Sequence, residues 1–286
     1  MARVFPPNVE TIIALAVEED LGRGDVTTRL TVPQGARSRG RAIARSRLVM
    51  SGGDVFEAVM RKVDPGIRVE HAKADGERAA AGDVLLAAEG PTDSLLMAER
   101  VALNFVQRLC GVATLTRAFV DALPQGSPTR IADTRKTTPG MRFLEREAVR
   151  HGGGCNHRVD LSGGILIKEN HAAAAGSVGE AVRLCRAGAP HPLRVEVEVR
   201  SFAELEEALA AGADAVLLDN MAPREIARCA QRARGKALVE ASGGVTLSNV
   251  GAIAAAGVDV ISVGGLTHSA PAADVSFLLD AVPPLP

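Results

Sequence analysis

The sequence predicts an α/β protein in which an incomplete (β/α) barrel follows an N-terminal α+β domain. Two observations carry this prediction: apolar strands alternate with helical segments from Ile131 onward, and the residues before Pro91 form mostly short β-like runs. Alternating βα units make a parallel sheet with right-handed crossovers, and about six closely spaced units favour a closed or nearly closed barrel over an open sheet. We predict an α+β domain over 1–112, a catalytic barrel over 113–268, and a C-terminal helix and tail over 269–286.

The N-terminal domain is predicted to begin with an amphipathic helix. Asn8 is its expected cap, Leu21 its expected end, and Val9, Ile13 and Val17 recur at helical spacing. Short runs rich in Val, Ile, Leu and Ala, separated by turn residues, predict strands at 41–45, 48–53, 67–71 and 83–88. A helix over 94–109 and a second one after Gly111, ending near Leu123, are predicted to follow.

Composition limits the classes of function. The hydrophobic fraction is 47% with no Trp, no Tyr and 7 Phe, so the core must consist of small aliphatic side chains, which suits helices packed on a parallel sheet. The formal charge of −1 gives no global field for nucleic acid or an anionic membrane. The 4 cysteines form no C-x-x-C pair. No secretory signal and no apolar run of about 18 residues is evident, so we expect a cytoplasmic protein.

The predicted barrel strands share one property: each ends in polar or glycine residues, whereas the opposite ends, such as Ala215 and Ala237, carry no reactive side chain. The strands are expected at 131–133, 165–168, 194–199, 215–219, 237–242 and 259–264, with helices between them at 141–150, 178–187, 203–211, 224–234 and 247–256. Reactive groups of βα barrels project from the carboxyl ends of the strands. Ordinary turn chemistry would explain one or two polar ends, so the whole set indicates an enzyme.

Charged residues are dense between Ile131 and His171, where nine of them surround short strands. Buried or clustered cations must be solvated, paired or matched to an anion, so this stretch predicts an anion-binding active site. The nine are Asp133, Arg135, Lys136, Arg142, His157, Arg158, Lys168, Glu169 and His171.

Two carboxylates are expected on one face of the third barrel strand. Glu196 and Glu198 are two residues apart, so both side chains point the same way and repel unless a cation is present. That cation is either Lys168, in an ion pair, or a divalent metal shared with Asp219, and oxygen-only ligands of this kind suit Mg²⁺. The two interpretations are compatible.

Glycine pairs follow the last two strands. Ser242-Gly243-Gly244 and Gly264-Gly265 allow backbone N–H groups to surround a phosphate, although a turn alone also needs glycine. The chain has neither a Walker motif nor a strand-linked G-x-G-x-x-G.

Two further interpretations concern the cations. His151, Cys155 and His157 resemble metal ligands, but three intervening glycines favour a flexible loop, with His157 and Arg158 as anion contacts. Lys168 at a strand end is also compatible with a Schiff base, although the neighbouring arginines favour a multiply charged anion over a lone carbonyl.

Long motifs spread over nearly the whole chain resemble those of the quinolinate phosphoribosyltransferase family. They are E-D-L-G-R-G-D-V-T-T, D-T-R-K-T-T-P-G-M-R, G-G-G-C-N-H-R, L-I-K-E-N-H, V-E-V-E-V, L-L-D-N-M, E-A-S-G-G-V and V-G-G-L-T-H-S. The resemblance implies transfer of phosphoribosyl from phosphoribosyl pyrophosphate to quinolinate with decarboxylation, as in de novo NAD biosynthesis. It also implies dimers with shared active sites, assembled in some members into hexamers.

The resemblance also implies residue roles. Arg135, His157, Arg158 and Lys168 would hold the two carboxylates of quinolinate, and Arg100 would reach in from a partner subunit. Glu198 and Asp219 would handle Mg²⁺ and the ribose hydroxyls, and with Lys136 and Lys168 they are the predicted catalytic residues. The other predicted substrate contacts, mostly to phosphate and pyrophosphate, are Thr134, Lys136, Ser242, Gly243, Gly244, Gly264, Gly265 and His268.

The match has two departures: Gly163 stands near a position where the family has an acidic residue, and Glu169 stands where Asp is usual. Competing interpretations are a related phosphoribosyltransferase-like protein encoded with molybdate transporters, a Schiff-base aldolase acting through Lys168, and an anion-binding module without turnover. The pair of Arg135 and Arg158, suited to a dicarboxylate, argues against the first of these.

Overall fold

The computed structural model describes residues 4–280, and these form two compact units. The first unit comprises 1–117, 137–153 and 266–286 as far as they are described, and the second comprises 118–136 and 154–265. Among residues 4–280, no helix combines the length and the apolar character needed to cross a membrane.

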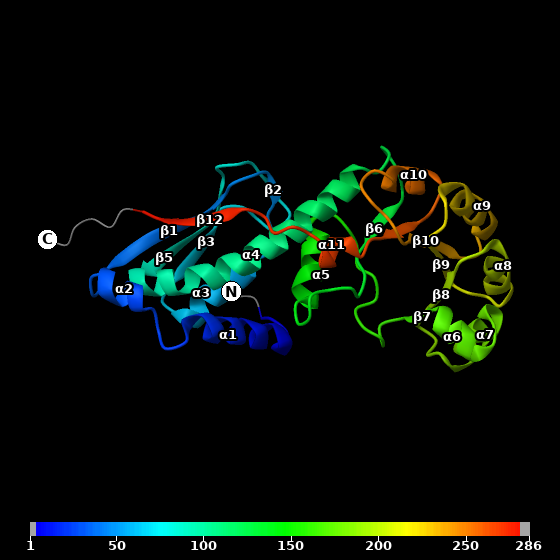
Figure 1. Ribbon diagram of the computed structural model, residues 1–286, viewed down its shortest axis with the longest axis horizontal. Coiled ribbons are helices and arrows are strands. Elements are labelled where there is room, and N and C mark those ends of the chain that lie inside the picture. The colour runs from blue at the N-terminus through cyan, green and yellow to red at the C-terminus, as the bar shows by residue number, and fades with distance from the viewer. Residues whose placement is uncertain (1–3, 281–286) are drawn as a thin grey trace. The chain divides into compact units, whose positions relative to one another are not determined.

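The first unit is built around an antiparallel sheet with strand order β12-β1-β5-β3 (Figure 1). A two-stranded ladder of β2 and β4 accompanies it. Its elements are α1 (Pro7–Leu21), α2 (Val26–Thr31), β1 (Arg37–Ala44), β2 (Leu48–Val49), α3 (Gly53–Val63), β3 (Arg68–His71), β4 (Arg78–Ala79), β5 (Val84–Pro91), most of α4 (Thr92–Asp121), α5 (Arg142–His151), most of α11 (Gly265–His268) and β12 (Val275–Leu279).

Several predictions for this unit are confirmed and some are wrong. Strands and an N-terminal helix lie where expected, but Asn8 is inside α1, and Pro6 occupies the cap position with Pro7 in the first turn. Helix α3 was not predicted, although Val55, Phe56, Val59 and Met60 form its buried side.

Helix α4 is continuous, whereas two helices separated at Gly111 were predicted. The glycine does not end the helix, because Leu109, Cys110, Val112 and Ala113 around it are all buried and continue the apolar face. A Cβ at Gly111 would lie 2.0 Å from the carbonyl oxygen of Pro271. Glycine is therefore required there for close packing of the chain against the helix.

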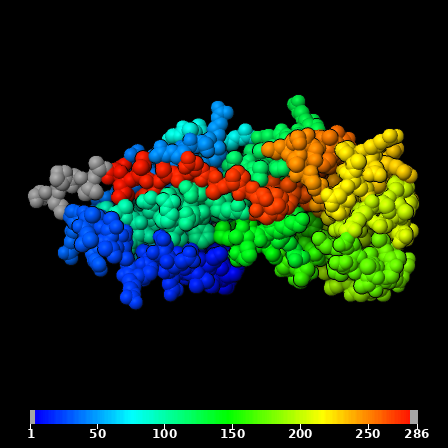
Figure 2. Space-filling model, in the orientation of Figure 1, coloured from blue at the N-terminus to red at the C-terminus, as the bar shows by residue number. Residues whose placement is uncertain are grey.

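The predicted C-terminal helix is wrong within the described residues. Val275–Leu279 forms strand β12, antiparallel to β1, because Val275 and Phe277 alternate with polar or exposed positions and cover the sheet. In Figure 2 this red segment lies on the surface beside α4, to which Gln107 fixes it by donating from Nε2 to the Val275 carbonyl at 2.8 Å. Residues 281–286 of the predicted tail lie outside the described part of the chain.

The second unit holds a six-stranded parallel sheet with strand order β6-β11-β10-β9-β8-β7, confirming the expected βα alternation. Helices α7, α8 and α9 lie on its outer side (Figure 1). Its elements are β6 (Arg130–Ala132), β7 (Ile165–Ile167), α6 (Glu169–Ala175), α7 (Val178–Gly188), β8 (Val195–Val199), α8 (Phe202–Ala210), β9 (Ala215–Asp219), α9 (Pro223–Ala233), β10 (Leu238–Ser242), α10 (Val250–Ala255) and β11 (Val260–Ser262).

The barrel is incomplete because β6 and β7 are the two edges of the strand order. All five neighbouring strand pairs are parallel, so the carboxyl ends of the strands meet at one rim. Buried aliphatic residues such as Val197, Val216 and Ile261 pack toward the helices. The polar carboxyl ends of the strands therefore indicate where the functional site lies.

The packing role of Gly111 is testable. Gly111→Ala is expected to destabilise the protein by about 1–3 kcal/mol, because the new methyl group collides with the Pro271 carbonyl and outweighs the helix propensity of alanine. Gly188→Ala is the matched control, since Gly188 is also helical and a Cβ there meets nothing within 4 Å. Urea unfolding of both variants measures the difference. Equal or increased stability of Gly111→Ala contradicts the packing role.

Candidate functional site

The segment that follows β6 and α5 is held against the sheet by one buried carboxylate. Asp133 is fully buried and accepts hydrogen bonds from the backbone N–H of His157 at 2.8 Å and from Asn156 Nδ2 at 2.6 Å. Cys155 donates its backbone N–H to the Ile131 carbonyl at 2.8 Å and bridges to Ala132 as a further strand would. These contacts fix the positions of His157 and Arg158 beside the sheet.

A cavity of about 240 Å³ opens where the strands end. Nine of the predicted site residues line it, together with Leu166, Leu217, Glu240 and Ser262. The nine are Thr134, Arg135, Lys136, His157, Arg158, Lys168, Glu198, Asp219 and Ser242. Lining residues that are up to 128 positions apart in the sequence, as Thr134 and Ser262 are, therefore lie around one space. We refer to this space as the mouth cavity.

Two guanidinium groups are held close together in the mouth cavity. Burial lowers the pKa of Arg158 and the neighbouring charge of Arg135 lowers it further, although a guanidinium stays protonated at any ordinary pH. Like charges that are kept near each other at a partly buried site are stabilised by an anion. The forked geometry of two arginines suits a ligand with two carboxylates.

Negatively charged side chains lie on the neighbouring strands. Burial raises the pKa of Glu198, the charge of Asp219 raises it further, and Lys168 and Lys136 oppose the rise. Glu196 and Glu198 both face the cavity side of β8, and the three valines of the strand are buried on the other face, as the two-residue spacing predicted. Glu198 and Asp219 are thus two oxygen donors at one rim, a donor set that fits Mg²⁺.

Arg200 is a cation of the site that sequence reasoning missed. Its guanidinium contacts Glu169, lies 3.5 Å from Glu198 Oε1 and lies 3.8 Å from Asp219 Oδ2. It directly follows the V-E-V-E-V strand, so its place at the strand end was the signal that would have found it. The contact also gives a structural context to Glu169, one of the two departures from the family pattern.

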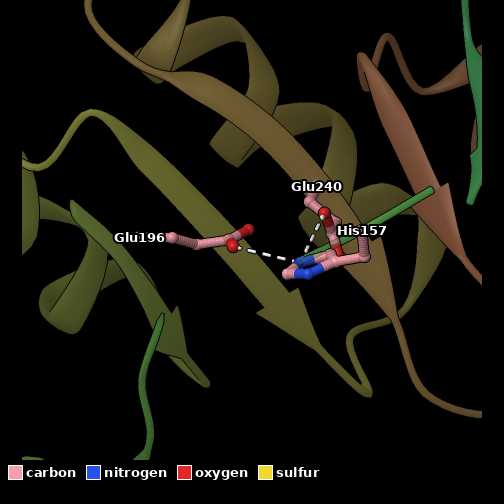
Figure 3. A group of neighbouring side chains, drawn as sticks. All are labelled: His157, Glu196 and Glu240. Atoms are coloured by element: carbon pink, nitrogen blue, oxygen red, sulfur yellow. Dashed lines mark ion pairs between the residues drawn. The ribbon is translucent and has the colours of Figure 1, made fainter. Parts of the chain in front are cut away.

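Glu196 contacts a histidine, a partner that was not predicted for it from the sequence. Glu196 Oε2 lies 3.1 Å from His157 Nε2, and Glu240 Oε2 lies 3.6 Å from the same nitrogen (Figure 3). Within residues 4–280, these three side chains are the one group in which three potential metal ligands lie close together. Cys155 belongs to no such group; its pKa is raised by burial, which keeps it a thiol. His151 lies in the other unit, where its Nδ1 is 2.9 Å from Ser51 Oγ.

The backbone conformation and the packing after β10 require glycine, whether or not a ligand binds there. Gly243 has φ = +89°, and a Cβ there would lie 2.3 Å from Asn220 Oδ1. Asn220 is a non-glycine residue with positive φ (+55°), and its backbone N–H donates to the Ser242 carbonyl at 3.0 Å. Gly244 also has positive φ (+59°). Phosphate binding at Gly243, Gly244, Gly264 and Gly265 therefore stays a prediction.

Two of the predicted site residues, Arg100 and His268, lie outside the mouth cavity. Arg100 is an exposed residue of α4 in the first unit, and His268 ends α11 in that unit, with Nδ1 2.6 Å from Ser269 Oγ. Lys168 sits at the N-cap of α6, and its backbone N–H donates to His171 Nδ1 at 2.9 Å. Its side chain lines the mouth cavity with Glu198 and Asp219.

The fold and the mouth cavity together define a βα-barrel enzyme that binds a multiply charged anion beside a pair of carboxylates. Family models agree with this class: the C-terminal domain of quinolinate phosphoribosyl transferase matches residues 112–278 and its N-terminal domain matches residues 25–110. The chain belongs to the quinolinate phosphoribosyltransferase family.

Individual proteins give the same result. The chain is 44% identical over 271 residues to nicotinate-nucleotide pyrophosphorylase (carboxylating) of Mycobacterium leprae, covering 93% of this chain and 95% of the relative. It is 41% identical over 259 residues to a probable enzyme of the same name from Bacillus subtilis, covering 91% and 89%. Its structure superposes on that of nicotinate-nucleotide pyrophosphorylase from Francisella tularensis with a TM-score of 0.92 at 36% identity, covering 98% of each chain.

The anchoring role of Asp133 can be measured without any ligand. Asp133→Ala is expected to destabilise the protein by about 2–4 kcal/mol, because two buried donors lose their acceptor, and to accelerate amide hydrogen exchange at 155–158. Asp160→Ala is the matched control: this exposed carboxylate accepts from the N–H groups of Ser162 and Gly163, so exchange should rise at 162–163 only. Unchanged protection of 155–158 in Asp133→Ala contradicts the anchor.

Proposed function

We propose that this chain transfers the phosphoribosyl group of phosphoribosyl pyrophosphate to quinolinate and decarboxylates the product. The products are nicotinate mononucleotide, pyrophosphate and CO₂. The observation that carries the proposal is the mouth cavity itself, where Arg135 and Arg158 lie together across from Glu198 and Asp219 in a chain of this family. The relatives' names, which include a quinolinate phosphoribosyltransferase (decarboxylating) of Nicotiana tabacum, support the same reaction.

Substrate binding is assigned by charge. The carboxylates of quinolinate bind Arg135, Arg158 and Lys168, with Thr134 and His157 beside them, because the two guanidinium groups already repel each other and an anion relieves that repulsion. The phosphate and pyrophosphate groups bind Lys136, Ser242 and the glycine turns after the last strands, with His268 as a further contact. The cations keep two negatively charged reactants together that would otherwise separate.

The chemical step needs a leaving group with stabilised charge and a sugar that accepts positive charge. The ring nitrogen of quinolinate attacks C1 of the ribose as pyrophosphate leaves, and Lys136 stabilises the negative charge that forms on the pyrophosphate. Glu198 and Asp219 stabilise the cationic sugar and orient its hydroxyl groups. Burial and the charge of Asp219 both raise the pKa of Glu198, and a developing cation beside the two carboxylates relieves their repulsion.

Decarboxylation follows from the new bond. Once the ring nitrogen is ribosylated it carries a positive charge, so the adjacent carboxylate leaves as CO₂ and the pyridinium ring receives the electron pair. A proton then replaces the carboxylate on the ring carbon. No organic cofactor is needed for this step.

A divalent ion is the implied cofactor. Glu198 and Asp219 would hold Mg²⁺, which would supply charge neutralisation for the pyrophosphate. Arg200, which now lies beside both carboxylates, is the group that would have to yield to it. The protein would act in the cytoplasm, where its four free cysteines stay reduced.

The arginine pair gives a direct test of the substrate. Arg135→Ala and Arg158→Ala are each expected to lower kcat/KM for quinolinate by about 100-fold or more, because each removes a charge-assisted contact to a carboxylate. Release of CO₂ and formation of nicotinate mononucleotide from quinolinate, phosphoribosyl pyrophosphate and Mg²⁺ are the measurements. Arg183→Ala, an exposed arginine paired with Glu180, should leave activity unchanged. Activity of the unaltered protein with nicotinate and none with quinolinate would overturn the assignment.

We also propose that the chain is a homodimer in which Arg100 contributes to the partner's site, and that dimers can assemble into hexamers. Arg100→Ala and Lys168→Ala are each expected to be inactive alone. Mixing the two in equal amounts after mild dissociation should recover about a quarter of the wild-type activity, because about half of the dimers are mixed and one of the two sites in each mixed dimer is intact. Mass spectrometry must show that mixed dimers have formed. If they form and activity does not return, the sites are not shared.

A further inference from the structure

His157 has both ring nitrogens engaged by the protein. Nε2 lies 3.1 Å from Glu196 Oε2 and 3.6 Å from Glu240 Oε2 (Figure 3). Nδ1 accepts the backbone N–H of Arg158 at 2.7 Å. Arg158 in turn donates from Nη1 to the Gly164 carbonyl at 2.9 Å and lines the mouth cavity. The orientation of the imidazole is thus linked to the position of an anion-binding arginine.

These contacts determine the tautomer of His157. Since Nδ1 accepts a hydrogen bond, it carries a lone pair, and the ring proton is on Nε2, facing the two carboxylates. A metal ion on Nε2 would move that proton to Nδ1, where it would meet the N–H of Arg158. The group of His157, Glu196 and Glu240 is therefore arranged to hold protons rather than a metal ion.

Glu240 is the most deeply buried member of the group. Its side chain is 4% exposed, and its Oε1 atom has no hydrogen-bond partner. A bare carboxylate oxygen away from water is costly, and the cost falls when the group is a neutral acid. Burial and the nearby charge of Glu196 raise the pKa of Glu240 to about 7, and His157 would oppose the rise only when it is positively charged.

Within residues 4–280, the strand neighbours of Glu240 carry no compensating charge. Leu217 and Val260, the register partners of Glu240 on β9 and β11, are apolar, and Ser262 offers a hydroxyl group. Cys155 is a thiol whose ionisation the charge of Glu240 disfavours. A second cavity of about 370 Å³ shares Glu240 with the mouth cavity, and the cations on its lining are Arg130, Arg158 and Arg194.

We propose that Glu240 is a positioning residue that is a neutral carboxylic acid when an anion is bound in the mouth cavity, where it and Glu196 fix His157 and thereby Arg158. The proposal rests on the proposed function, because the ligand of Arg158 is a dicarboxylate. An ionised Glu240 would place a second buried negative charge next to that ligand. The neutral acid keeps the hydrogen-bonding shape of the group without the repulsion.

The direction of the pH dependence follows from this. A bound dianion favours the protonated form of Glu240, so quinolinate binding takes up a proton, and affinity falls as the pH rises through the free protein's value of about 7. If the dianion raises the pKa of Glu240 by about one unit, the dissociation constant for quinolinate rises about tenfold across that range. A purely structural glutamate would give neither effect.

Calorimetry of quinolinate binding tests the proposal without turnover. The dissociation constant and the number of protons taken up are measured in buffers of different ionisation enthalpy, from about pH 6 to about pH 8.5. Glu240→Gln, which keeps the shape but cannot ionise, should lose proton uptake and flatten the tenfold change to about twofold or less. Glu180→Gln, on the exposed face of α7, is the matched control and should keep the wild-type profile. Wild-type proton uptake in Glu240→Gln would overturn the proposal.

Two further measurements keep the result unambiguous. In the wild-type protein, infrared difference spectra should show the protonated-carboxyl band growing when quinolinate is added slightly above neutral pH, and an unchanged band would contradict the proposal even if Glu240→Gln does not fold. A transition metal ion recovered in equal amount with the wild-type protein and lost in Glu240→Gln would also overturn it. Failure of the wild-type protein to bind quinolinate at all would instead overturn the proposed function.

Discussion

The arrangement of the site depends on the buried carboxylate of Asp133. A fully buried charge must be surrounded by donors, and here the donors are the side chain of Asn156 and the backbone N–H of His157. Because these belong to the segment that runs beside β6, Asp133 fixes where the chain leaves the sheet edge. His157 and Arg158 reach the mouth cavity only because that segment is held. A surface carboxylate could not do this, since water would compete for the same donors.

Repulsion between like charges is the second constraint. At one rim of the sheet, two arginines repel each other and two carboxylates repel each other. Burial lowers the pKa of Arg158 and raises that of Glu198, and the like charges of Arg135 and Asp219 add to these shifts. Both groups are therefore partly removed from water and held near a charge of their own sign. A site of this kind is complete only when reactants supply the missing opposite charges. Arg200 neutralises part of the negative charge of Glu198 and Asp219, from which it lies 3.5 Å and 3.8 Å away.

Local sequence patterns predicted much of the fold and of the site. Contacts between residues far apart in the sequence could not be predicted from such patterns. The two-residue period placed Glu196 and Glu198 on one face, and glycines and polar strand ends predicted the rim. The contact between His157 and Glu240 joins elements that are not neighbours in the strand order, so no spacing could reveal it. The sequence predicted the end of a helix at Gly111. Glycine is required there because the Pro271 carbonyl packs against it, and Pro271 is 160 positions away along the chain.

The incomplete barrel explains why a polar group can lie in its interior. Closed barrels fill their interior with layers of branched aliphatic side chains. Here β6 and β7 are not paired with each other, and a cavity of about 370 Å³ remains on the inner side, bordered by His157, Glu196 and Glu240. Polar side chains in that space cost stability relative to a packed apolar core. This cost is explained if the polar side chains position the residues of the mouth cavity. The hydrogen bond from the Arg158 N–H to His157 connects them to that cavity.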